Sequence, residues 1–367
     1  MLFYLTNSLI VPKESPEYTR ILDAVKYLGI AAYESYHMLL GDSEVIKYYR
    51  EALALNDMVY PVLNYIYQNE AMCSVPQEIT YYIEIVKDNP SEYYRGTKRV
   101  QQLPYSHFNC LAKCNPTILL SEDQNDGSFY NYILAWYKLE NNIKINQNLE
   151  TRNGGGGNTA RELSILESSS RICITIIDTD RRYPGSAIRK DSTAYKCQII
   201  HNESPISQLY LLDVHEIENL IPLNYIDKEE IGGGREKAAA KKHFNFLRAE
   251  ADDIFPYYDF KKGLKITSIK SGDIDISFAQ KCFDCIPENE RKAANMLEYI
   301  SGVERNGFED KIFVGFGTSI LPNTLNYLDA NKFSDAPILL EFQRRHWIQI
   351  AQLLLDWGIS RNNERFS

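Results

Sequence analysis

Several features are missing from this sequence of 367 residues. No run approaches 18 uninterrupted apolar residues, so we expect no membrane-spanning helix. The first 20 residues have neither a basic start nor a small-residue cleavage site, so we expect no signal peptide. Cysteine is sparse and odd in number, at seven, which favours reduced thiols and a cytoplasmic location.

An excess of positive charge is also missing. Forty Lys and Arg face 49 Asp and Glu, for a net charge of −9. This excludes binding to nucleic acid through overall charge and leaves only a local patch. At 44% hydrophobic residues, the chain can build a real core, which excludes a disordered chain and a small disulfide-stapled scaffold.

Three regions differ in their patterns. Residues 1–113 place apolar groups at helical spacing over 17–40 and 43–68, which predicts a helical N-terminal module. Its many tyrosines indicate aromatic packing, or alternatively a surface for bases or a partner. Residues 226–367 are predicted to form an α+β extension, with a glycine loop and helix over 231–253 and an amphipathic helix over 337–360.

The middle region, residues 114–225, alternates short apolar runs with helical patterns over 129–142 and 159–170. This alternation predicts βαβ units and therefore an α/β fold with a mostly parallel sheet. Because the runs are continuously apolar, we expect helices on both faces of the sheet. The runs are TILLS (117–121), RICITII (171–177) and LYLL (209–212).

Acidic residues follow each of these runs, and ligands bind beyond the carboxyl ends of parallel strands. Carboxylates crowded there repel each other unless a cation neutralises them, and hard oxygen ligands favour Mg²⁺ or Mn²⁺. The alternative is a set of turn and helix-cap residues, with Asp126 capping a helix that begins near Ser128. The predicted ligands are Glu122, Asp126, Asp178, Asp180, Glu216 and Glu218.

Two of these ligands are in doubt from spacing alone. Glu216 and Glu218 point to opposite sides in a strand and about 200° apart in a helix, so we expect at most one to bind the ion. Asn219 shares a helical face with Glu216 and is a candidate for its support. Lone histidines are seldom ligands, so His107 and His215 are set aside.

Phosphate-binding candidates are a glycine run and local basic residues. Gly155 and Gly156 are placed to cradle a phosphate with backbone N–H groups, or alternatively to form a tight turn. Residues 235–270 hold nine Lys or Arg against five acids, which indicates a phosphate-binding stripe or a solvated face. The basic candidates are Arg181, Arg182, Lys241 and Lys242.

A structural zinc site is a weaker alternative for the cysteines. Cys110 and Cys114 form a Cys-x₃-Cys pair, and Cys282 and Cys285 form a Cys-x₂-Cys pair. Four thiolates would suit Zn²⁺, but buried free thiols are the default for such residues.

Three motifs in order carry a family resemblance. ILLSEDQND, then NGGGG, then ITIIDTD resembles the Toprim fold of topoisomerases, bacterial primases and overcoming-lysogenization-defect nucleases. The Glu122-x₃-Asp126 form is similar to the nuclease branch, and HEIENLIP (215–222) resembles Toprim-like proteins of bacterial anti-phage systems. The resemblance implies a metal held by Asp178 and Asp180, with Glu122 as a ligand or general acid/base, and a basic residue beyond the Asp-x-Asp. Candidates for that residue are Lys237, Lys241, Lys242, Lys261 and Lys262.

The sequence therefore predicts a divalent-metal-dependent nuclease acting on DNA or tRNA, with a role in anti-phage defence implied by resemblance alone. The 337–357 helix suits the core or a dimer seam, so a homodimer is a further candidate for a partner. The alternative function is a non-catalytic Toprim-like interaction subunit of a defence complex with an ATPase partner. GGGGNT lacks the lysine of a P-loop, so ATP hydrolysis would come from that partner. Primer synthesis would need a nucleotide-binding apparatus that the sequence does not show.

Overall fold

The computed structural model describes residues 1–69, 74–228, 235–306, 310–331 and 334–361. The chain forms two compact units. The first comprises Met1–Ile176, Ile200–Tyr210 and Gln349–Ser367, and the second comprises Ile177–Ile199 and Leu211–Ile348. The glycines at 232–234, part of the predicted glycine loop, lie outside the described residues. The predicted domain boundaries at 113 and 225 stay predictions.

The first unit begins with a sheet that the sequence analysis did not expect. Five strands run in the order β2-β1-β3-β5-β4, all parallel except the β4–β5 hairpin. The strands are β1 (Leu2–Leu5), β2 (Met38–Gly41), β3 (Tyr81–Val86), β4 (Glu92–Arg95) and β5 (Lys98–Pro104). The accompanying helices are α1 (Tyr18–Tyr33), α2 (Ser43–Ala52) and α3 (Tyr60–Gln68).

The prediction of a helical N-terminal module is therefore wrong in part. Its helices are confirmed, but they accompany a sheet. The error has a physical cause: runs of four apolar residues such as Leu2–Leu5 are too short for periodicity to separate strand from helix. The helical spacing over 17–40 likewise extends past the end of α1 at Tyr33 and into the strand Met38–Gly41.

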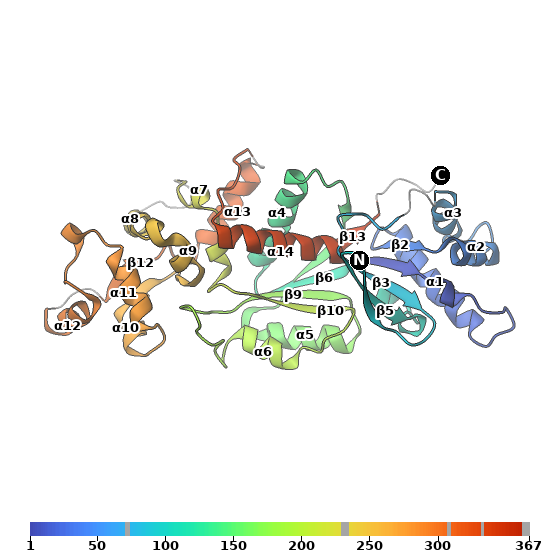
Figure 1. The fold of residues 1–367 in the computed structure, drawn as a ribbon, viewed down its shortest axis with the longest axis horizontal. Coiled ribbons are helices and arrows are strands. Elements are labelled where there is room, and N and C mark those ends of the chain that lie inside the picture. The colour runs from blue at the N-terminus through green and yellow to red at the C-terminus, as the bar shows by residue number, and fades with distance from the viewer. Residues whose placement is uncertain (70–73, 229–234, 307–309, 332–333, 362–367) are drawn as a thin grey trace. The chain divides into compact units, whose positions relative to one another are not determined.

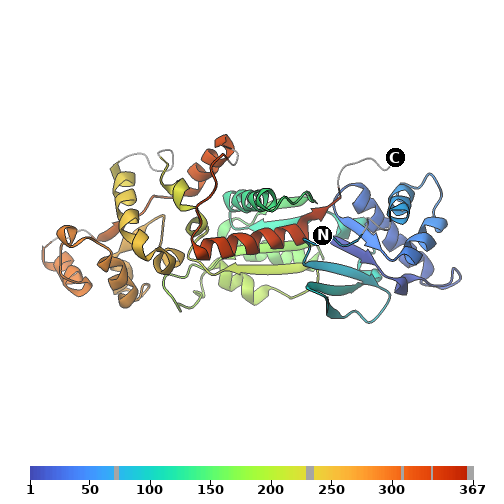
Figure 2. The same ribbon diagram turned by 45° about the horizontal axis from the view of Figure 1, so that its top comes forward.

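A second sheet of the first unit carries the predicted apolar runs. Its order is β10-β9-β6-β8 and its strands are parallel, which confirms the α/β class with a mostly parallel sheet. Helices α4 (Gln124–Glu140) and α5 (Thr159–Ser168) lie on opposite faces of the sheet (Figures 1 and 2). The strands are β6 (Thr117–Ser121), β8 (Leu149–Asn153), β9 (Cys173–Asp178) and β10 (Ser207–Leu212). A Toprim-like topology is not established by this order.

The central strands of this sheet are buried on both faces. Every residue of β6 is buried, as are the first five of β9. A continuous apolar run has this pattern because helices cover both faces of a parallel sheet. A small antiparallel pair, β7 (Asn146–Gln147) with β13 (Ile359–Ser360), completes the unit.

The end of a long helix belongs to the first unit. Helix α14 (Glu341–Gly358) brings Asp356 to the start of β3, where it accepts from the Thr80 N–H at 2.7 Å and from the Thr80 hydroxyl at 2.6 Å. The Thr117 hydroxyl donates to the Trp357 carbonyl at 2.7 Å. These contacts join the C-terminal helix to the strands of both sheets of the unit.

In the part of the second unit that the structure describes, helices surround one antiparallel pair, β11 (Gly263–Lys265) with β12 (Lys311–Val314). This agrees with the α+β class expected for the C-terminal region. A strand expected within 256–279 is limited to three residues, because Ile266–Lys270 continues as a helix. Besides the first part of α14, the described helices of the second unit are α6 (Thr193–Ile200), α7 (Leu223–Ile226), α8 (Arg235–Leu247), α9 (Ala251–Ile254), α10 (Ile266–Lys270), α11 (Ile276–Asp284), α12 (Met296–Asn306) and α13 (Ile320–Asn331).

Candidate metal centre

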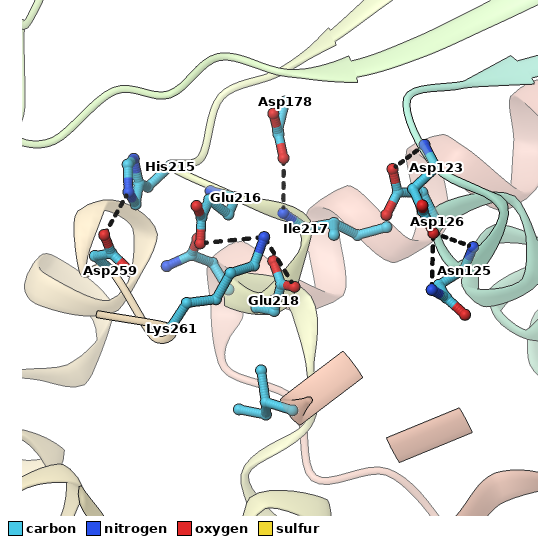
Figure 3. A network of polar contacts seen from close by, with 12 residues as sticks. Asp123, Asn125, Asp126, Asp178, His215, Glu216, Ile217, Glu218, Asp259 and Lys261 are labelled. Atoms are coloured by element: carbon cyan, nitrogen blue, oxygen red, sulfur yellow. Dashed lines mark hydrogen bonds and ion pairs between the residues drawn. The ribbon is translucent and has the colours of Figure 1, made fainter. Parts of the chain in front are cut away.

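Two of the acidic segments predicted from the sequence meet in the second unit. Asp178 is the last residue of β9, and its carboxylate accepts from the Ile217 N–H at 3.1 Å (Figure 3). The Thr179 hydroxyl donates to the Val214 carbonyl at 2.8 Å, and the Asp180 N–H donates to the His215 carbonyl at 3.0 Å. The Asp-Thr-Asp turn therefore lies directly against the segment that follows β10, as the strand-end argument requires.

The segment that follows β10 is rigidly held. The Asn219 side chain donates to the Tyr258 carbonyl at 2.8 Å. Gln343 donates to the Asn219 carbonyl at 2.9 Å, and the Trp347 indole donates to the Leu220 carbonyl at 2.9 Å. Asn219 also accepts from the Glu216 N–H at 2.7 Å, so it fixes the backbone that carries the acidic residues.

Glu216 and Glu218 approach the same ammonium group, contrary to the expectation that they point apart. The Lys261 Nζ lies 3.6 Å from the Glu216 carboxylate and 3.1 Å from the Glu218 carboxylate (Figure 3). The expectation failed because neither a strand nor a helix runs through both residues. Glu216 is extended, with φ −140° and ψ 161°, and a 3₁₀ turn begins only at Ile217.

The two carboxylates are buried and incompletely hydrogen-bonded. Glu216 is 8% exposed and Glu218 is 2% exposed, and one oxygen of each has no hydrogen-bond partner among the described residues. Glu84, equally buried in β3, shows the usual solution: Tyr93, Arg95 and Gln102 all donate to it. Oxygens left without donors are costly in a protein interior.

The electrostatics reflect that incomplete compensation. Burial raises the pKa of Glu218 to about 7, although Lys261 opposes the shift. Burial and the charge of Asp259 raise the pKa of Glu216. For Lys261, burial would lower the pKa, but Glu218, Glu216 and Asp178 together raise it. The cluster therefore favours added positive charge.

A histidine that the sequence analysis set aside belongs to this cluster. His215, Glu216 and Asp259 each offer one ligand atom, and these atoms all lie within 4.8 Å of one another. His215 is 2% exposed, and neither ring nitrogen has a hydrogen-bond partner among the described residues; its Nε2 lies 3.6 Å from the Asp259 carboxylate. Adjacency to Glu216 was the only sequence signal for His215, and nothing marked Asp259.

The basic residues predicted to bind substrate are engaged elsewhere. Arg181 pairs with Asp213 at 2.5 Å and Arg182 with Asp273 at 3.4 Å. Lys241 donates to two backbone carbonyls, and Lys242 pairs with an acidic side chain. Their assignment as substrate-binding residues stays a prediction.

A cavity of about 80 Å³ opens beside the cluster in the same unit. Asp259 is one of its lining residues, so the cavity is adjacent to the candidate ligands. Its other charged lining residues are all cationic: Arg182, Lys262 and Lys265. Of the basic residues predicted from the sequence, Arg182 and Lys262 therefore lie where an anion could approach the carboxylates.

The remaining predicted ligands belong to the first unit. Asp123 is the N-cap of α4, and its N–H donates to the Asp126 carboxylate at 2.9 Å (Figure 3). Asp126 is therefore the N3 residue of a capping box rather than the N-cap of a helix near Ser128. Glu122 lies at the end of β6 and accepts, through its backbone carbonyl, from the Gly156 N–H at 3.0 Å.

The glycine run closes over the end of β6. The Gly154 N–H donates to the Ser121 carbonyl at 2.8 Å, and the Gly155 N–H donates to the Asn153 side chain at 2.7 Å. With the Gly156 bond, all three amides are used within the protein. Gly155 and Gly156 have positive φ, 73° and 59°, which accounts for glycine at both positions. The tight-turn interpretation therefore has direct support, and phosphate binding stays a prediction.

The cysteines proposed for zinc divide between the units, with Cys110 and Cys114 in the first and Cys282 and Cys285 in the second. Burial raises the pKa of Cys114 to about 12 and also raises that of Cys282. The structural zinc site stays a prediction.

Comparisons with known proteins add no assignment. Among the described residues, no helix is both long and apolar enough to cross a membrane. No protein-family model, no curated protein and no solved structure matches the chain. The Toprim resemblance therefore rests on the sequence motifs, and the functional argument rests on the geometry of the site.

Proposed function

We propose that the protein is a divalent-metal-dependent phosphodiesterase that cleaves nucleic acid, with Asp178, Glu216 and Glu218 as metal ligands. One observation carries the proposal: two buried glutamates with unsatisfied oxygens lie beside Lys261, next to the carboxylate of Asp178. A purely structural site would gain stability by losing one of these charges.

The donor set fits the ion that the proposal requires. Carboxylate oxygens on a rigid turn are the ligands that Mg²⁺ and Mn²⁺ prefer. When bound, such an ion supplies activation of water and neutralises charge that develops on the phosphate. Asp180 is part of the same turn, and its backbone is left-handed, with φ of 55°. Of the turn's two acids, Asp180 is the less well supported as a metal ligand.

The chain's own groups have separate tasks. Lys261, which its acidic neighbours hold in the ammonium form, offers hydrogen bonds and charge to a phosphate oxygen. Asn219 and Ile217 orient the ligands through the backbone. Arg182, Lys262 and Lys265 around the neighbouring cavity attract the phosphate backbone against the unfavourable net charge of the protein.

A second candidate function is a non-catalytic subunit of a defence complex. It is favoured by the engagement of Arg181, Arg182 and Lys242 in ion pairs, which leaves little of the expected basic stripe available to nucleic acid. The role in anti-phage defence, in this proposal as in the nuclease proposal, rests on the sequence resemblance alone, and so does the ATPase partner. A homodimer stays a prediction.

The test is cleavage of supercoiled plasmid, linear duplex, single strands and total tRNA with Mg²⁺, Mn²⁺ or EDTA. Wild type is compared with Asp178→Asn and Glu216→Gln. The matched control is Asp191→Asn, an exposed acid of the same unit that pairs with Arg189. We expect both site variants to lose activity by about 10³-fold and the control to retain it. Equal cleavage by wild type and both site variants would overturn the metal-ligand assignment.

Absence of cleavage by the purified protein and by complexes isolated from native cells would favour the interaction subunit. In that outcome, Asp178→Asn should leave assembly with the partner unchanged. The same cell-derived complexes, assayed with Mn²⁺, separate an inactive subunit from an enzyme that needs its partner.

A further inference from the structure

His215, Glu216 and Asp259 form a ligand group that the proposed function does not use as a whole. Their ligand atoms all lie within 4.8 Å of one another. Ligand atoms of one ion lie at most about 4.4 Å apart, so binding of an ion would need only a small inward movement of these side chains. They come from two segments held together by backbone contact, since the His215 N–H donates to the Pro256 carbonyl at 2.7 Å. The group is therefore preorganised by the fold.

The unsatisfied atoms of the group point to a missing ligand. His215 is 98% buried, yet both ring nitrogens lack hydrogen-bond partners among the described residues, and so does one oxygen of Glu216. His201 and His243 have partners: His201 bonds Glu167 at 2.7 Å, and His243 accepts from the Val314 N–H at 2.9 Å. His346 is buried without a partner for either ring nitrogen among the described residues, so what distinguishes His215 is the two carboxylates beside it. An ion at His215 and Glu216 would satisfy groups that otherwise carry a desolvation cost.

Charge balance agrees with one divalent cation. When all four are ionised, the carboxylates of Asp178, Glu216, Glu218 and Asp259 exceed the two ammonium groups of Lys261 and Lys262 by two negative charges. Lys261 lies closer to Glu218 than to Glu216, at 3.1 against 3.6 Å, so the oxygen of Glu216 is the less compensated of the two.

The imidazole decides which class of ion fits. Mg²⁺ prefers oxygen ligands and retains its waters, whereas imidazole nitrogen suits first-row transition metals. One nitrogen with two carboxylate oxygens is a set that Mn²⁺, Co²⁺ and Zn²⁺ accept. We propose that His215, Glu216 and Asp259 bind a divalent transition-metal ion in preference to Mg²⁺. The inference goes beyond the proposed function, because His215 and Asp259 have no part in it.

The experiment measures binding without nucleic acid. The full chain is stripped with a chelator and titrated separately with Mn²⁺, Zn²⁺ and Mg²⁺ by calorimetry, and with Co²⁺ by visible absorption. We expect saturable binding of Mn²⁺ and Zn²⁺ at least about tenfold tighter than that of Mg²⁺, and Co²⁺ bands typical of mixed nitrogen and oxygen ligands.

Two variants and a matched control assign the site. His215→Gln and Asp259→Asn should each weaken Zn²⁺ and Mn²⁺ binding by about tenfold or more and change the Co²⁺ bands. The control is His346→Gln. His346 is also buried in the second unit, and among the residues that the structure describes its ring nitrogens lack hydrogen-bond partners and it belongs to no such ligand group. It should bind as wild type does.

Either of two results would overturn the inference: no saturable binding by folded wild type, or His215→Gln and Asp259→Asn that bind as tightly as wild type. If a variant does not fold, pulsed electron paramagnetic resonance of Mn²⁺ bound to wild type decides, since the inference requires nitrogen coupling. Binding of Mn²⁺ or Zn²⁺ without cleavage of nucleic acid supports this inference and counts against the nuclease. Cleavage with Mg²⁺, together with no nitrogen coupling to bound Mn²⁺, supports the nuclease and counts against this inference.

Discussion

The Lys261 ammonium lies 3.1 Å from the Glu218 carboxylate, and Lys262, its neighbour in sequence, points instead to Asp259 at 3.8 Å. Lys261 is about a quarter exposed, whereas Lys262 is 60% exposed. Two adjacent lysines therefore differ in their role: one compensates buried carboxylates and the other lies mostly in solvent. The first prediction uses this difference.

Lys261→Met should destabilise the fold by about 3–5 kcal/mol at pH 8, because it leaves Glu216 and Glu218 buried without their cation. The folded-state pKa of Glu218, about 7, lies above its ordinary value of 4.5, so stability falls as pH rises through 7. The variant should enlarge that fall in stability and approach the stability of wild type at pH 5. Urea unfolding in EDTA measures the free energy of unfolding at each pH. Lys262→Met serves as the control, with a change below about 0.5 kcal/mol expected, and equal losses in both would contradict the assignment.

Asp126→Ala separates capping from metal binding. Loss of the capping box should cost about 1 kcal/mol of unfolding free energy in EDTA, as should Asp123→Ala. If Asp126 is also the ligand predicted from the sequence, Mg²⁺ should stabilise Asp123→Ala but not Asp126→Ala. Thermal shifts with and without Mg²⁺ distinguish the two; equal shifts would leave Asp126 with capping alone.

The glycine run should respond unevenly to alanine. In Gly154→Ala the new Cβ would lie 2.3 Å from the Thr159 hydroxyl. In Gly155→Ala the new alanine would have to adopt a φ of 73°. We expect a loss of about 1–3 kcal/mol for the first and about 1–2 kcal/mol for the second. Gly157→Ala meets no atom within 4 Å and should be near neutral. Urea unfolding of the three variants tests this order, and a destabilised Gly157→Ala would contradict it.

Asp356 should give the first unit a stability that declines with pH. Burial raises its pKa to about 6, against the bonds from Thr80 that lower it. Because the folded-state pKa lies above the ordinary 3.8, the contribution is complete below pH 3.8 and is lost as pH rises through 6, up to about 3 kcal/mol. Asp356→Asn should remove this slope between pH 4 and 7. A slope in the variant equal to that of wild type would show that another group is responsible.

Local pattern predicted much of the fold. The run Thr117–Ser121 is the strand expected, and the helices over 18–33, 43–52, 60–68 and 341–358 follow from apolar spacing. Short strands escaped prediction: Leu2–Leu5 and Met38–Gly41 gain their strand character from pairing with each other, a contact between residues 36 apart that no local window contains.

The sequence by itself determined that acids follow the apolar strands, because a continuously apolar run that is buried on both faces, as β6 and β9 are, leaves its end as the place for charge. It could not bring Lys261, Asp259 and His215 to Glu216. Only the tertiary structure decided that, since the segment from 255 to 262 meets the turn at 215–218 through backbone contacts to His215 and Asn219. Long-range hydrogen bonds of this kind depend on the folded backbone rather than on the local residue pattern. They therefore decide which of the chain's many carboxylates lie together in one site.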